Sequence, residues 1–449
     1  MVEKITEISC NRYMRIISKP WLRLSLGLFF LSASALLFLW AISGGEADND
    51  SSKIVKISEL RHSLSTQLSN YFLKNQFPVE AEIELDGAKQ VSNLIYTIDP
   101  GLQTRAEKLI KSYKPDYAAV VILNADTGAV KAMVSYQKDN PEPQNWALNN
   151  SFPAASIFKI VTATAALEKG NLDPDSIIMF NGNNHTLYKK NVMSTKVNRW
   201  TREMTIKEAF AKSVNTVFGR ISLEKIDPTD IREYAIRFGF NRNIDSDLPF
   251  DPGFAEIPDD KSYHLTELAS GFNKVTKMSP IQGAMIAASV ANDGIMKVPY
   301  VIDSITSKEG KILYASENVT AAITMNKEGA EKLKELMSAT VHKGTSRKSF
   351  IPFLRDKKVK EIEVGGKTGS ITGNDPKGKI DWFVGYAISD REKLAIAAIT
   401  VNVKYWTVKS SYVAQHLFKS YFKENYPNTK EFASRDRAKK SPASETQPK

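Results

Sequence analysis

Cysteine is almost absent from this 449-residue chain, and a short, metal-type spacing of histidines is absent altogether. The single cysteine, Cys10, excludes an intramolecular disulfide and any site built from several cysteine ligands. The five histidines are scattered along the sequence: His62, His185, His264, His342 and His416. We therefore expect no structural zinc or other metal site, and no motif indicates a cofactor.

A nucleic-acid motif is also lacking, although the formal charge of +11 would suit an anionic partner such as nucleic acid, a membrane or cell wall. The basic residues are dispersed, so a solvated basic surface is the simpler interpretation, and we expect no nucleic-acid partner. With 42% hydrophobic residues, the chain can build one large domain or two moderate ones. No internal repeat divides it.

One long uncharged segment lies near the N-terminus. Residues 24–42, LSLGLFFLSASALLFLWAI, are about long enough to cross a bilayer core as a helix. Basic residues precede the segment and acidic residues follow it, so the positive-inside rule predicts a cytoplasmic N-terminus and an exported remainder. A cleaved signal peptide, with a small-residue site at 41–43, is the alternative. The apolar core is longer than the usual roughly 7–15 residues, which favours an uncleaved single-pass anchor in the plasma (inner) membrane.

Hydrophobic periodicity divides the rest of the chain. Residues 57–72 carry apolar side chains at helical spacing and predict a small amphipathic helix. The predicted divisions are a cytoplasmic stub (1–23), a transmembrane anchor (24–43), a linker with the small amphipathic segment (44–95), a main domain (96–426) and a disordered tail (427–449).

Strand patterns lie at both ends of the main domain, and a mainly helical region lies between them. A hairpin is predicted from 118–124 and 129–136, joined by the turn Asp126-Thr127-Gly128. The later elements are strands at 361–371, 382–388 and 394–403 and a closing helix at 410–424. This pattern predicts an α+β fold whose sheet is assembled from distant parts of the chain, with an inserted helical subdomain.

Ser156 and Lys159 form a Ser-x-x-Lys motif at the start of a helical segment, PAASIFKIVTATAALEKG. Residues three apart share a helix face, so a neutral lysine amine can take the proton of the serine hydroxyl and make it a nucleophile. The motif arises easily by chance, and Ser420 with Lys423 repeats it in the closing helix without partner motifs. The second copy is interpreted as structural.

Two further motifs follow. Ser213 and Asn215 lie in a helical pattern, TIKEAFAKSVNTVFGRI, and offer a hydroxyl and an amide; Ser316-Glu317-Asn318 is a chance copy of this motif. Residues 365–370, GGKTGS, lie in a predicted strand whose glycines allow another backbone to approach. Lys367 would attract a substrate carboxylate and would also disfavour protonation of a nearby Lys159. The alternative for this segment is a basic strand edge or a glycine bulge.

In this order, Ser-x-x-Lys, Ser-x-Asn and Lys-Thr-Gly-Ser make the signature of the penicillin-recognising serine enzymes. Over residues 96–426 the chain resembles the transpeptidase domain of penicillin-binding proteins. Four further segments resemble marks of that domain: 96–110, 277–294, 342–346 and 381–388. The resemblance implies a transpeptidase fold similar to that of serine β-lactamases, in which helices flank a central antiparallel sheet.

The resemblance also implies roles for single residues. The implied catalytic residues are Ser156, Lys159, Ser213 and Asn215, and the implied substrate-binding residues are Lys367, Thr368, Gly369 and Ser370. Ser156 would be the acylated nucleophile and Lys159 its general base, and the backbone N–H groups of Ser156 and Ser370 would form the oxyanion hole. The implied substrate is the D-Ala-D-Ala end of a peptidoglycan stem peptide, which is cross-linked to a second stem, with β-lactams as inhibitors. A separate glycosyltransferase partner would fit this role.

Other activities share these motifs. In a D,D-carboxypeptidase water replaces the acceptor amine, and the motifs fix only the acylation step. A β-lactamase is disfavoured because the Glu-x-x-Leu-Asn segment of class A enzymes is lacking. A β-lactam sensor or a non-catalytic scaffold is disfavoured by the intact motifs and the short cytoplasmic stub.

Two features depart from the family pattern. Pro153-Ala154-Ala155 stands where the family usually has Pro-Gly before the nucleophile, so the turn into the helix is expected to differ slightly. The roughly 50 residues between the anchor and the main domain are too few for a glycosyltransferase domain or an extended pedestal. We therefore expect a monofunctional transpeptidase module.

Overall fold

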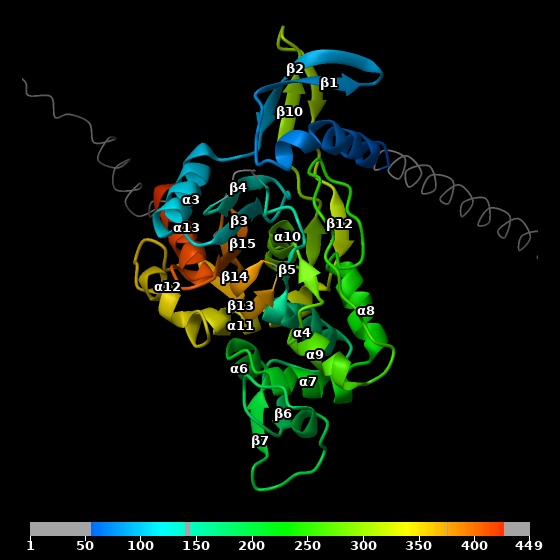
Figure 1. Cartoon of the computed structure of the whole chain (residues 1–449), viewed down its shortest axis with the longest axis vertical. Coiled ribbons are helices and arrows are strands. Elements are labelled where there is room, and N and C mark those ends of the chain that lie inside the picture. Colours follow the sequence, from blue (N-terminus) through cyan, green and yellow to red (C-terminus); the bar gives the residue numbers. More distant parts are fainter. Residues whose placement is uncertain (1–54, 140–143, 375, 426–449) are drawn as a thin grey trace, which may run out of the picture. The chain divides into compact units, whose positions relative to one another are not determined.

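The computed structural model describes residues 55–139, 144–374 and 376–425 (Figure 1). It consists of two units, residues 1–60 and 61–449. In the first, the described residues 55–60 are helical. No helix of the described residues is long and apolar enough to cross a bilayer. The predicted anchor at 24–43 and the predicted tail at 427–449 lie outside the described residues.

A five-stranded antiparallel sheet forms the centre of the second unit. Its strands, in spatial order, are β13 (Glu363–Asn374), β14 (Lys377–Ile388), β15 (Lys393–Asn402), β3 (Tyr117–Asn124) and β4 (Val130–Gln137). The pairing of β15 with β3 joins segments that lie about 270 residues apart in the chain, with Ile396 opposite Ile122. The predicted sheet, assembled from distant segments, is therefore confirmed.

Helices cover both faces of this sheet (Figure 1). Successive side chains of a strand point to opposite faces. Ile396 and Ala398 of β15 belong to a core shared with α3 (Pro100–Tyr113), α12 (Arg347–Leu354) and α13 (Ser410–Asn425). On the other face, Gly283 of α10 (Pro280–Ala291) packs against Ala397. Every residue of α10 is buried, which suits a helix whose residues are mostly apolar.

The predicted helical region between the two parts of the sheet is also present. Its helices are the 3₁₀ turn η1 (Ala155–Phe158), α4 (Lys159–Glu168), α5 (Lys189–Val192), α6 (Ile206–Ala211), α7 (Asn215–Glu224), α8 (Pro228–Arg237), α9 (Tyr263–Ser270) and α11 (Lys327–His342). Short strand pairs interrupt it: β5 (Phe152–Pro153) with β8 (Lys277–Met278), β6 (Ile177–Phe180) with β7 (Arg202–Thr205), and β9 (Ile295–Lys297) with β12 (Thr320–Ile323).

A second sheet, of four strands, was not predicted. It consists of β1 (Glu80–Leu85), β2 (Ala88–Tyr96), β10 (Ile302–Thr306) and β11 (Ile312–Ala315) in that spatial order. Residues 61–72 form the predicted amphipathic helix, with Leu64, Leu68 and Phe72 buried. Strands β1 and β2 belong to the predicted linker segment 44–95, yet β2 pairs with β10 of the predicted main domain. The predicted domain boundary at residue 96 therefore falls between β2 and β10, which are paired strands of one sheet. The division of the chain into these domains stays a prediction.

Candidate active site

Ser156 and Lys159 lie at the start of the helix that the sequence predicts for them. Ser156 belongs to the 3₁₀ turn η1, and Lys159 is the first residue of α4. The Lys159 Nζ lies 2.9 Å from the Ser156 Oγ and donates hydrogen bonds to the Asn215 Oδ1 at 2.8 Å and to the Ser270 carbonyl. The lysine is 0% exposed. The amine is therefore buried and surrounded by three oxygen partners, one of which is the serine hydroxyl.

This environment favours the neutral form of Lys159. Burial and, secondarily, the charge of Lys367 hold the pKa of Lys159 well below its ordinary value. Burial also lowers the pKa of Lys367 to about 7. The repulsion between the two lysines that the sequence predicts is thus present, but desolvation is the larger cause. A lysine that loses its proton easily can accept the proton of a hydroxyl.

Ser213 lies in a break between two helices, and Asn215 is the first residue of the second. The helical pattern of this segment is interrupted here, because α6 ends at Ala211 and α7 begins at Asn215. Ser213 has a φ of 56° in the left-handed region, and its Oγ accepts a hydrogen bond from the Lys367 Nζ at 2.8 Å. Asn215 faces Lys159 instead. The break allows two residues only two positions apart to contact two different lysines.

The Lys-Thr-Gly-Ser motif lies on β13, an edge strand of the central sheet, as predicted. Lys367 points inward and is 0% exposed. The Thr368 Oγ1 lies 2.5 Å from the Thr345 Oγ1. Gly369 faces the 3₁₀ turn η1 that carries Ser156, since a Cβ added to Gly369 would lie 3.2 Å from Ile157. All eight predicted site residues therefore lie around one centre.

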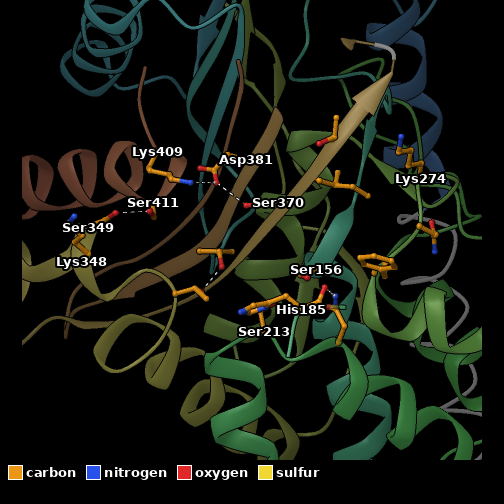
Figure 2. A pocket seen from close by; sticks show the side chains of 18 residues that line it. Ser156, His185, Ser213, Lys274, Lys348, Ser349, Ser370, Asp381, Lys409 and Ser411 are labelled. Atoms are coloured by element: carbon orange, nitrogen blue, oxygen red, sulfur yellow. Dashed lines mark hydrogen bonds and ion pairs between the residues drawn. The ribbon is translucent and has the colours of Figure 1, made fainter. Parts of the chain in front are cut away.

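A cavity of about 730 Å³ opens on this centre. Ser156, Ser213 and Ser370 line it (Figure 2), and so do Asn215 and Thr368. Residues that sequence reasoning did not single out as site residues also line it, among them His185, Lys274, Lys348 and Lys409. The chance copies lie elsewhere: Lys423 binds the Asp356 carboxylate, and Ser316 contacts Arg61. The described residues hold no cluster of side chains suited to a metal ion.

Comparison with known proteins identifies this arrangement. The model of the penicillin-binding protein transpeptidase domain matches residues 118–423. The chain belongs to this family. The matched range contains the three motifs and all of the central sheet except Tyr117, the first residue of β3.

Two named relatives illustrate the family's range. The peptidoglycan D,D-transpeptidase PbpA of Mycobacterium tuberculosis is 26% identical over 350 residues, which cover 69% of this chain and 67% of the relative. Penicillin-binding protein 1A of Neisseria lactamica is 29% identical over 281 residues, covering 60% of this chain and 30% of the relative.

Solved structures show the same fold. The crystal structure of PBPA from Mycobacterium tuberculosis superposes with a TM-score of 0.61 at 23% identity, covering 74% of this chain and 82% of that one. The D,D-transpeptidase domain from Eggerthella lenta also gives 0.61, at 22% identity, covering 75% of this chain and 84% of that one. The predicted transpeptidase fold is therefore confirmed.

Asp381 is a residue of this penicillin-binding protein site that the sequence reasoning missed. Its carboxylate accepts the Ser370 Oγ–H at 3.1 Å and the Ser410 N–H at 2.8 Å, and the Lys409 Nζ lies 3.4 Å away. Burial raises the pKa of Asp381 despite these partners. The segment 381–388 was recognised as a family mark, but the pairing of Ser370 with Asp381 across β13 and β14 appears only in the fold. Ser370 must turn its hydroxyl away from Asp381 to donate to a substrate.

The turn before the nucleophile depends on Gly271. Ala155 has a φ of 48°, at the position where the family pattern usually has glycine, and its carbonyl oxygen lies against Gly271. A Cβ at Gly271 would lie 1.9 Å from that oxygen, and Gly271 itself has a φ of +65°. Real Cβ atoms do not approach backbone so closely, so a side chain at 271 must displace the Ala155–Ser156 peptide.

We therefore expect Gly271→Ala to impair both folding and acylation. Left-handed backbone costs an alanine roughly 1–2 kcal/mol, and the displaced turn brings the total loss of unfolding free energy to about 3 kcal/mol or more. The acylation rate constant with penicillin should fall at least about tenfold, because Ser156 moves relative to Lys159. Denaturant unfolding and stopped-flow acylation measure the two effects.

Gly310→Ala is the matched control. Gly310 has a φ of +86°, and an added Cβ would meet no atom within 4 Å. This variant should lose only the roughly 1–2 kcal/mol of unfolding free energy that left-handed backbone costs an alanine. Its acylation rate constant should equal that of the wild type. Equal behaviour of the two variants would show that the contact with Ala155 is unimportant.

Proposed function

We propose that this chain is a serine-type peptidoglycan D,D-transpeptidase, inhibited by β-lactams, in which Ser156 is the acylated residue. The observation that carries the proposal is the buried Lys159 amine, with its lowered pKa, at 2.9 Å from the Ser156 Oγ. A relative carries the name peptidoglycan D,D-transpeptidase, and this supports the same substrate class here.

Acylation would begin when the neutral Lys159 amine takes the proton of Ser156. The Ser156 Oγ then attacks the carbonyl carbon of the penultimate D-Ala. The backbone N–H groups of Ser156 and Ser370 would stabilise the oxyanion that forms. When the C–N bond breaks, Ser213 would relay to the leaving D-Ala nitrogen the proton that Lys159 took from Ser156, so that Lys159 is neutral again before deacylation. The Lys367 Nζ, which donates to the Ser213 Oγ at 2.8 Å, would hold that hydroxyl in position.

Substrate recognition would use the β13 edge. Lys367, Thr368 and Ser370 would surround the terminal carboxylate, while the extended stem peptide adds along the edge strand. Asn215 would fix the Lys159 amine through its Oδ1, since its Nδ2 is held by the His185 carbonyl at 3.0 Å. Deacylation repeats the chemistry in reverse: the amine of a second stem loses a proton to Lys159 and attacks the ester, and Ser156 leaves with a proton.

The same proposal includes the position of the enzyme in the cell. Residues 24–43 would anchor it as a single-pass protein with residues 1–23 in the cytoplasm, and residues 96–426 would be the exported catalytic domain, joined by 44–95 and followed by the tail 427–449. A separate glycosyltransferase would supply the glycan strands. The supporting observation is the charge asymmetry around the apolar segment.

Mass spectrometry of reaction products tests the function. The full chain is incubated with polymerised lipid-linked peptidoglycan, with and without an added acceptor strand. We expect cross-linked dimers and free D-Ala, with the dimers increasing when acceptor is added. The matched control is the enzyme pre-acylated with penicillin, which should yield neither product.

Other products would contradict the proposal. Release of D-Ala with shortened stems and no dimers would identify a D,D-carboxypeptidase. Rapid loss of a bound penicillin as its hydrolysed form would identify a β-lactamase. Stable penicillin binding without any turnover of peptidoglycan would identify a sensor or scaffold.

A further inference from the structure

The insertion between β6 and β7 carries an unusual density of positive charge. Residues 181–203 contain a single acidic residue, Glu203. The basic residues of the same segment are Lys189, Lys190, Lys196, Arg199 and Arg202. A cluster of this kind on a short insertion favours an anionic ligand.

Large apolar side chains are exposed on the same insertion. Trp200 is 71% exposed, Val197 69% and Tyr188 63%. The Arg199 guanidinium lies 4.8 Å from the centre of the Trp200 ring, so that cation and aromatic surface are presented together. Exposed apolar side chains that lie together and are surrounded by polar residues often mark an interaction site, whereas single exposed apolar side chains do not. We call residues 188–202 the insertion surface.

The insertion surface begins at the rim of the catalytic cavity. The Asn184 carbonyl accepts the Asn215 N–H at 2.7 Å, and the next residue, His185, lines the cavity. The Leu187 carbonyl accepts the Tyr263 Oη–H at 2.5 Å. Tyr188 therefore follows directly on a segment that is fixed to the catalytic wall. A polymer leaving the cavity on this side would pass over the insertion.

We propose that the insertion surface binds the glycan strand of peptidoglycan together with its acidic stem peptides. This inference rests on the proposed function and deepens it from the reacting peptide to the polymer that carries it. The C–H faces of the sugar rings would stack on Trp200 and Tyr188, and the stem carboxylates would pair with the lysines and arginines. Amphipathic aromatic rings suit ligands that are apolar on one face and polar at the edge.

The position of the insertion favours this ligand over a lipid surface. In Figure 1, β6 and β7 lie at the end of the unit opposite to β1 and β2. The helical residues 61–72, through which the chain enters this unit, lie near β1 and β2 in the same view. The chain thus enters this unit at the end remote from the insertion, whereas the insertion follows directly on His185 at the rim of the cavity, so that a wall polymer can reach both.

Co-sedimentation of the full chain with purified peptidoglycan sacculi tests the proposal. The first variant is Tyr188→Ala/Trp200→Ala, and the second is Lys189→Gln/Lys190→Gln/Lys196→Gln. The first variant loses the aromatic rings on which the sugars would stack. Its affinity for sacculi should fall about tenfold, as expected from the stacking free energy of exposed aromatic side chains. The second should bind more weakly and with a reduced dependence on salt, because fewer charge pairs are screened. Acylation by penicillin, a small ligand, should stay at the wild-type rate in both.

Matched controls come from exposed residues elsewhere. Lys357→Gln/Lys358→Gln/Lys360→Gln removes the same charge from a loop that does not line the cavity, and Tyr71→Ala removes an exposed ring from the helical residues 61–72. Both should bind sacculi like the wild type. Unchanged binding by the insertion variants, or an equal loss in the controls, would overturn the proposal. So would a loss of binding to anionic phospholipid vesicles with sacculus binding intact. Failure of the proposed function would appear separately, as lost acylation or lost products in the wild type.

Discussion

Ser156→Ala should form no covalent adduct with a fluorescent penicillin. The substitution removes the hydroxyl that lies 2.9 Å from the Lys159 amine, and the proposed acyl-enzyme cannot form without that oxygen. The fold should persist, since a partly exposed hydroxyl at the cavity wall is lost without opening a large void. Gel fluorescence followed by mass spectrometry of the labelled peptide measures the result.

Ser420→Ala is the control, because Ser420 and Lys423 repeat the same spacing. The Ser420 Oγ donates to the His416 carbonyl, and the Lys423 Nζ lies 3.1 Å from the Asp356 carboxylate. Hydrogen bonds to that carboxylate hold the pKa of Asp356 at about 2. The Lys423 amine is therefore engaged by a charged carboxylate, while the Ser420 hydroxyl is bonded to a backbone carbonyl. Ser420→Ala should label like the wild type. Label on Ser156→Ala, or its absence from Ser420→Ala, would refute the assignment of the nucleophile.

The contrast between these two serines shows what a sequence alone can predict. The order of the three motifs along the chain is enough to distinguish Ser156 from Ser420. The sheet was predictable because its strands are long apolar segments such as AAVVILN at 118–124. The closing helix was predictable from its periodicity, and it begins at Ser410, as expected.

Other features depend on contacts that no local pattern carries. The left-handed φ of Ser213 breaks a pattern that is helical by periodicity, and the break is held by tertiary hydrogen bonds such as that from Lys367. The strand EAEIEL of β1 is short, and half of its residues are charged. Its alternation of charged and apolar residues indicates a strand only once its pairing with β2 is known. The contact of Asp381 with Ser370 and Ser410 joins three separate elements. Such contacts are properties of the fold.

Lys159→Met should slow acylation by penicillin about a thousandfold, the contribution expected of a positioned general base. Methionine has a similar length and no proton to exchange, and the site is already 0% exposed. Removing the amine also leaves the buried Asn215 Oδ1 and Ser270 carbonyl without this donor, so the variant should lose about 1–3 kcal/mol of unfolding free energy. Stopped-flow acylation rates and denaturant unfolding separate the catalytic effect from any structural one.

The pH dependence of the same variant distinguishes a base from a merely electrostatic lysine. A base must be neutral, so wild-type acylation should fall as pH is lowered through the depressed pKa of Lys159, and the residual rate of Lys159→Met should lack that step. Lys274→Met is the matched control: Lys274 lines the same cavity, but its Nζ contacts Asn374 at 3.1 Å. It should lose less than about tenfold in rate and keep the wild-type pH profile, because only local charge is removed. Similar losses in both variants would mean that the cavity needs positive charge and not a proton acceptor at Ser156.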